Sequence, residues 1–147
     1  LKNALAGKVR DLGLANRIEW RGAEPQERVL KALKESDIFV LPSRITKSGD
    51  RDGLPNVLME AQSQRLACIS TEISAIPELI LPEVTGLLVP PDDVPALTDA
   101  LERLIRDPQQ RLRLGKAGEA RLRAEFGLEQ NIGTLLDLLG VKAREAA

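Results

Sequence analysis

The chain has 147 residues, 21 of them basic and 22 acidic, so its formal net charge is −1. That balance gives no long-range attraction toward nucleic acid, and two Phe, one Trp and no Tyr leave few aromatic side chains for stacking bases. Because the sequence has no histidine and a single cysteine, it excludes the usual zinc sites and an internal disulfide, and we expect no metal and no nucleic-acid partner.

The length suits a single domain over residues 1–147, large enough to bury roughly two-thirds of the surface of the unfolded chain. No apolar run reaches the ~20 residues of a membrane-spanning helix, and the first residues lack the pattern of a signal peptide. We therefore expect a cytoplasmic protein.

Helix and strand patterns alternate along the first ninety or so residues. They predict, in chain order, a helix over 1–12, a strand over 18–21, a helix over 25–34, a strand over 37–41, a helix over 55–64, a strand over 66–70, a helical turn over 76–80 and a strand over 87–89. Such alternation is typical of a parallel sheet flanked by helices, in which ligands bind beyond the carboxyl ends of the strands.

After two prolines at 90–91 the pattern becomes helical. Apolar residues between 96 and 105 recur at helical spacing and predict a helix that packs on the sheet. Further helices are predicted over 108–125, with its many basic residues in solvent, and over 128–139. The expected fold class is an α/β, Rossmann-like domain with a helical C-terminus.

The stretch 52–61 (DGLPNVLMEA) is the most informative, because it sets two carboxylates eight residues apart around a Gly-Pro turn at a helix start. Pro55 suits the first helical position, so the helix begins near Asn56. The backbone N–H groups of Asn56, Val57 and Leu58 are expected to lack intrahelical acceptors, and with the helix dipole they can hold a phosphate.

Glu60 lies one turn after Asn56, beside the apolar stripe of the same helix, and can therefore face a cleft. A carboxylate there does not suit a phosphate, but it can accept hydrogen bonds from two sugar hydroxyls, each worth about 1.5 to 3 kcal/mol. The pattern suits a ribose. The alternative interpretation is an ordinary proline-initiated helix with one exposed glutamate.

Six short segments follow one another along the chain: RIEWRG (17–22), SDIFVLPS (36–43), DGLPNVLMEA (52–61), LACIST (66–71), IPELI (76–80) and TGLLVPPD (85–92). In this order they resemble the C-terminal domain of GT-B glycosyltransferases of family 4, also called glycosyltransferase group 1. The resemblance implies a nucleotide-sugar-binding domain of a retaining enzyme that transfers a sugar from a nucleotide-diphosphate sugar.

The resemblance also implies roles for particular residues. It assigns Glu60 to the donor ribose and Asp52, one methylene shorter than the family's usual Glu, to hydroxyls of the transferred sugar. The segment after Asp52 contacts the sugar or the diphosphate, which implicates Gly53, Leu54, Pro55, Asn56 and Val57. No residue is assigned as a general acid or base, and no cofactor is implied besides the donor itself.

In the same family the nucleobase lies near the loop after a strand that here ends at Arg21 and Gly22, and main-chain groups make much of the contact. The resemblance therefore places the base beside these two residues. The alternative is that Arg21 is an ordinary solvated arginine and Gly22 a glycine at a strand end.

Family members have parts that are not in this sequence, namely an N-terminal acceptor domain and two strands that precede the first helix. We therefore expect a partial domain, truncated at its N-terminus and inactive by itself. In the Rossmann order 3-2-1-4-5-6 those strands would lie between 18–21 and 37–41, so we expect an exposed sheet edge, a rearranged pairing or self-association through that edge. Family habit suggests a polysaccharide or a glycolipid acceptor, the latter membrane-associated.

Two other functions stay open. One is a GT-B epimerase acting on a nucleotide sugar, and the other is a non-catalytic nucleotide-binding or assembly module on the same scaffold. An ordinary dinucleotide-binding domain is disfavoured, because no Gly-x-Gly-x-x-Gly turn follows any predicted strand.

Overall fold

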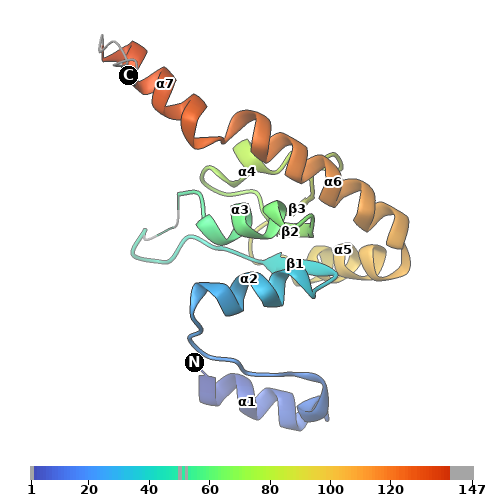
Figure 1. The fold of residues 1–147 in the computed structure, drawn as a ribbon. Helices are drawn as coiled ribbons and strands as arrows, with labels where there is room; N and C mark the ends of the chain where they lie inside the picture. Colours follow the sequence, from blue (N-terminus) through green and yellow to red (C-terminus); the bar gives the residue numbers. More distant parts are fainter. Residues whose placement is uncertain (1, 50, 52, 140–147) are drawn as a thin grey trace.

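The computed structural model describes residues 2–49, 51 and 53–139 (Figure 1). Its elements are α1 (Lys2–Asp11), a 3-10 helix η1 (Ala15–Arg17), α2 (Gln26–Lys34), β1 (Ile38–Leu41), α3 (Asn56–Ser63), β2 (Ala67–Thr71), α4 (Ile76–Leu79), β3 (Leu87–Val89), α5 (Val94–Arg106), α6 (Pro108–Glu125) and α7 (Leu128–Leu138). The alternation of helix and strand expected from the sequence is confirmed, and the bounds lie close to those predicted, with one exception.

The exception is the strand predicted over 18–21, which does not form. Ile18 has an extended backbone, with φ −123° and ψ 122°, but no described strand pairs with it. A strand exists only through a ladder of hydrogen bonds to a neighbour. The extended conformation of this segment was predictable from its residues, whereas the strand also needs a partner that the described part of the chain does not supply.

The sheet is parallel, three-stranded among the described residues and ordered β1-β2-β3. Ile38 lies opposite Ala67 across the first pair of strands, and Ile69 lies opposite Leu87 across the second. All five residues of β2 are buried, as expected for a central parallel strand. Among the described strands β1 has a neighbour on one side, so the exposed edge that the sequence predicted is present.

Helices pack on both faces of this sheet (Figure 1). Side chains alternate along β2, so Cys68 belongs to one core cluster, with residues of α2, α3 and α4, while Ile69 belongs to the other, with residues of α5 and α6. Leu58 and Leu104, one from each cluster, are fully buried. Two apolar layers around one buried strand therefore hold the loops at the ends of the strands in place.

The terminal helices lie away from the sheet, at opposite ends of the molecule in Figure 1. α1 packs on η1, and Leu12, directly after α1, is 71% exposed, while Leu138 of α7 is 80% exposed. None of the helices in the described part of the chain combines the length and the apolar character needed to cross a bilayer.

Candidate functional site

The loops that leave β1 and β2 are tied together at the carboxyl end of the sheet. Thr71 Oγ1 donates a hydrogen bond to the Ser43 carbonyl oxygen at 2.6 Å. The Ala75 amide donates to the Gly53 carbonyl oxygen at 3.2 Å. The predicted position of both loops, beyond the strand ends where ligands of parallel sheets bind, is confirmed.

The first turn of α3 begins at Asn56, as predicted, but Pro55 does not occupy the first helical position. Pro55 is the residue before the helix, because its ψ of 121° is extended rather than helical, although its φ of −65° would fit a helix. The Leu58 amide donates to the Pro55 carbonyl oxygen at 3.0 Å, so the prediction of a free Leu58 amide was wrong. The Asn56 and Val57 amides precede that bond, at the end where helix donors lack intrahelical acceptors.

The segment before α3 is anchored on both sides of Gly53. The Gly53 carbonyl is held by the Ala75 amide, and the partly buried Leu54 side chain packs on the core cluster that includes Leu58. The Leu54 side chain therefore takes part in the packing around this cluster. Asp52, the predicted sugar contact, lies outside the described residues.

Glu60 is partly buried, one turn after the start of α3. Its Oε1 accepts a hydrogen bond from Gln26 Nε2 at 3.3 Å. Gln26 is the first residue of α2 and Glu60 lies midway along α3, so this bond links the two helices. Sequence reasoning missed Gln26, because a side-chain contact between residues 34 positions apart leaves no local pattern.

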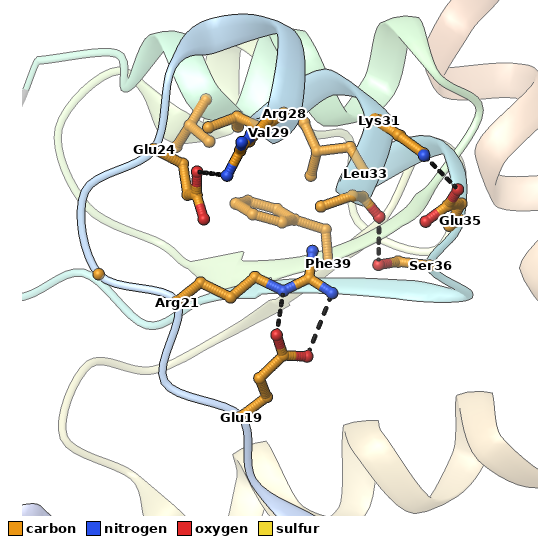
Figure 2. Close-up of a pocket in the computed structure, with 13 residues that line it drawn as sticks. Glu19, Arg21, Glu24, Arg28, Val29, Lys31, Leu33, Glu35, Ser36 and Phe39 are labelled. Carbon is orange, nitrogen blue, oxygen red and sulfur yellow. Dashed lines mark hydrogen bonds and ion pairs between the residues drawn. The ribbon is translucent and has the colours of Figure 1, made fainter.

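A pocket of about 500 Å³ lies between the segment 19–24, α2, β1 and the first turn of α3. Three predicted site residues, Arg21, Gly22 and Val57, line it. Figure 2 shows the Phe39 ring in the middle of the lining, with Arg21 on one side and Val29 on the other. The structure thus brings together residues from two distant stretches that the sequence had implicated separately. The other described site residues, Gly53, Leu54, Pro55, Asn56 and Glu60, do not line this pocket.

The rim of the pocket is charged but locally paired (Figure 2). Arg21 Nε lies 3.2 Å from Glu19 Oε1, and the hydrogen bond between these side chains raises the pKa of the Arg21 guanidinium. Arg28 Nη1 lies 3.4 Å from Glu24 Oε2. Because both arginines already have carboxylate partners, they contribute little net positive charge to the mouth of the pocket.

Gly22 has a specific backbone role at this pocket. Its φ of +72° lies in the left-handed region, where glycine is accommodated without steric cost. That conformation turns the chain from the extended segment toward α2 and exposes the main chain around Arg21 and Gly22. Because no strand forms over 18–21, Gly22 is not a glycine at a strand end but a turn glycine in the wall of the pocket.

The described residues offer neither a cluster of metal ligands nor a reactive thiol. Within the ranges that the structure describes, no three His, Cys, Asp or Glu side chains gather in a way that could hold a metal ion. Cys68 is buried in β2, and burial raises the pKa of its thiol to about 12, so the thiol stays protonated and unreactive at neutral pH.

The parallel sheet with helices on both faces defines a Rossmann-like class of fold. The family model described as "Glycosyl transferases group 1" matches residues 2–107, so the chain belongs to this family. The resemblance drawn from the six sequence segments is confirmed.

Relatives at the sequence level are longer proteins. The amylovoran biosynthesis glycosyltransferase AmsK of Erwinia amylovora is 39% identical over 126 residues, which cover 86% of this chain and 30% of AmsK. The putative colanic acid biosynthesis glycosyltransferase WcaL of Escherichia coli K12 is 39% identical over 84 residues, which cover 57% of this chain and 21% of WcaL. The chain spans less than a third of either relative.

Solved structures confirm the GT-B fold. Sucrose-phosphate synthase from Thermosynechococcus elongatus superposes with a TM-score of 0.79 at 30% identity, over 93% of this chain and 34% of the enzyme. The C-terminal domain of the group 1 family protein LpcC from Francisella tularensis gives 0.75 at 25% identity, over 86% and 63%. Anabaena HepE in complex with UDP gives 0.83 at 17% identity, over 94% and 36%, and indicates the fold alone.

Proposed function

We propose that this chain is the donor-binding part of a retaining glycosyltransferase, which transfers a sugar from a nucleotide-diphosphate sugar to a polysaccharide or glycolipid acceptor. The observation that carries the proposal is the convergence at the start of α3. Val57 lines the pocket together with Arg21 and Gly22, and Glu60 follows on the same helix, one turn further along.

Each part of a nucleotide diphosphate has a matching group here. The Asn56 and Val57 amides, with the positive end of the helix dipole, suit the diphosphate. The Glu60 carboxylate accepts hydrogen bonds from the ribose hydroxyls. The pocket receives the base, whose polar edge meets the main chain of Arg21 and Gly22.

The sugar itself is assigned to Asp52 and the Gly53 amide, by resemblance to the family. In the proposed reaction preorganised protein groups stabilise the leaving diphosphate, with neither metal nor resident cofactor, and no described residue serves as a general acid or base. The acceptor site belongs to another part of the full-length enzyme, so we expect the chain alone to bind donor without turning it over.

The relatives support this proposal by what their names say. AmsK and WcaL are named for the biosynthesis of amylovoran and colanic acid, and HepE has been solved with UDP and with UDP-glucose. A polymer acceptor and a nucleotide-diphosphate donor are therefore the classes to test first.

A non-catalytic assembly module is the second candidate, and the edge of β1 that no other described strand pairs with favours it. Exposed strand edges recruit further strands, and a second copy of the chain supplies one. This candidate predicts an average mass that rises with concentration in sedimentation equilibrium and no nucleotide binding. A constant monomer mass would remove it.

Calorimetric titration of the folded chain with UDP, GDP and ADP tests the proposed function. We expect one nucleotide to bind saturably and Glu60→Ala to weaken it about a hundredfold, since two lost charge-assisted hydrogen bonds cost about 3 kcal/mol or more. Glu102→Ala, which removes an exposed glutamate on α5, is the matched control and should bind like the wild type. Silence toward all three nucleotides, or equal binding by Glu60→Ala, contradicts the proposal.

A further inference from the structure

We infer that Gln26 is a positioning residue, which holds the Glu60 carboxylate ready for the ribose hydroxyls before the nucleotide arrives. The inference rests on the proposed function. It starts from the hydrogen bond between Gln26 Nε2 and Glu60 Oε1, at 3.3 Å, which joins the first residue of α2 to α3.

The chemistry of the partner matters. In the part of the chain that the structure describes, this carboxylate accepts a hydrogen bond from the Gln26 amide and takes part in no ion pair. A cation would neutralise Glu60 and compete with sugar hydroxyls for its oxygens. A neutral amide orients the carboxylate and leaves its negative charge intact, and an ionised carboxylate has about four lone-pair sites, so both oxygens can still accept.

Orientation has a measurable value for a side chain of this kind. A free glutamate populates several rotamers, and a ligand that binds it must first confine it to one. The Gln26 amide makes that selection in the unbound protein, and preorganisation of this sort increases affinity by lowering the cost of ordering on binding. We expect a threefold to tenfold gain in nucleotide affinity from Gln26.

The same helix also forms part of the base pocket. Arg28, Val29 and Leu33 of α2 line the pocket of about 500 Å³, while Gln26 at the start of α2 reaches Glu60. One helix therefore contacts the two ends of the nucleoside that we propose: its side chains line the wall at the base, and its first residue fixes the acceptor at the ribose.

A double-mutant cycle on the folded chain tests the inference. The probe is whichever of UDP, GDP and ADP binds the wild type. Binding is measured by NMR chemical-shift titration, which can determine dissociation constants in the millimolar range. Gln26→Ala should weaken binding threefold to tenfold, and Gln26→Glu should weaken it more, because it replaces the donor with a like charge. In the Glu60→Ala background Gln26→Ala should have no further effect.

Two comparisons separate positioning from a merely structural role. A 2′,3′-dideoxynucleotide, which lacks both ribose hydroxyls, should bind wild type and Gln26→Ala equally. Gln109→Ala, which removes an exposed glutamine of α6, should bind the nucleotide as tightly as the wild type. Because Gln26 is exposed, Gln26→Ala should leave the melting temperature unchanged.

The outcomes distinguish this inference from the proposed function. If the wild type binds and Glu60→Ala does not, but Gln26→Ala equals the wild type, the inference is overturned and the donor site stands. The same holds if the loss in Gln26→Ala persists in the Glu60→Ala background. If the wild type binds none of the three nucleotides, the proposed function fails and the role of Gln26 fails with it.

Discussion

At the scale of single residues, Gly115 shows how closely α6 approaches the rest of the fold. A Cβ at this position would lie 1.9 Å from the Arg65 carbonyl oxygen, and Arg65 itself has a φ of +61° in the turn after α3. The atoms that a Cβ would meet here belong to the backbone of Arg65 and Leu66, not to a side chain that could move aside. The glycine is therefore required by the contact between α6 and this turn.

We predict that Gly115→Ala lowers the free energy of unfolding by about 1 to 3 kcal/mol, because the added methyl group forces backbone apart in a packed region. Urea denaturation followed by circular dichroism measures the change. Gly133→Ala is the matched control, since a Cβ there meets nothing within 4 Å on α7, and it should not lower stability. Equal loss in both variants would mean that the close approach is relieved without cost.

The candidate site also depends on single atoms. Glu60 was predicted from its place eight residues after Asp52, and the structure adds its partner Gln26. The predicted phosphate cradle loses one of three amides, because Leu58 already donates to Pro55. Local pattern indicated which residues to consider, while hydrogen-bond geometry decided which groups remain free.

At the scale of elements, one carboxylate links α6 to the turn after α3, in addition to the close packing at Gly115. The Glu119 side chain accepts from Arg65 Nε and from Arg123 Nη2, the latter at 2.9 Å, and is 13% exposed. These hydrogen bonds lower the pKa of Glu119 below its ordinary value near 4.5, and the bond from Arg65 contributes more than the bond from Arg123. The ionised form therefore belongs to the folded state.

This lowered pKa predicts how stability changes with pH. A group whose pKa is lower in the folded protein stabilises it above the ordinary value, and that contribution is lost as pH falls through the folded value. We expect urea midpoints of the wild type to exceed those of Glu119→Gln at about pH 7, and the difference to shrink as the pH falls below the ordinary glutamate pKa.

The control for this prediction is another glutamate on the same helix. Glu125 pairs with Arg121 at 2.6 Å, but its side chain is 50% exposed, so Glu125→Gln should follow the wild type through the same pH range. A constant difference between wild type and Glu119→Gln at every pH would show that the ionised carboxylate is not what holds α6.

At the scale of the whole molecule, stability is unevenly distributed. β2 is buried along its length between two apolar clusters, whereas α1 packs on η1 and α7 leaves apolar residues in solvent. Figure 1 shows the two terminal helices at opposite ends, away from the sheet. A helix with little buried surface opens at small cost, since its stability comes mainly from packing.

Hydrogen exchange measured by mass spectrometry should therefore distinguish three groups of amides: those of the terminal helices, those of β2, and those of the helices packed on the sheet. Amides of α1 and α7 should exchange orders of magnitude faster than those of β2, because local opening needs far less free energy than global unfolding. Peptides from α5 and α6, which pack on the sheet, serve as the internal reference for protected helix. Protection of α1 equal to that of β2 would contradict this picture and indicate a partner on its exposed face.

The sequence by itself determined the class of fold and most of its elements. Period and turn residues are local properties, so they located α3 to within one residue at either end, the buried run of β2 and α6 over Pro108–Glu125. The ordered series of six segments determined the family, because each short segment is weak while their order is specific.

The tertiary structure alone decided what depends on contacts between distant residues. The segment 18–21 does not form a strand, although Ile18 is extended, because strand pairing needs a neighbour that periodicity cannot supply. Gln26 reaches Glu60 across 34 positions, and Arg21 shares a pocket with Val57, because the parallel sheet stacks α2 beside α3. Local pattern specifies elements, but a site is formed by side chains and backbone groups that only folding brings into contact.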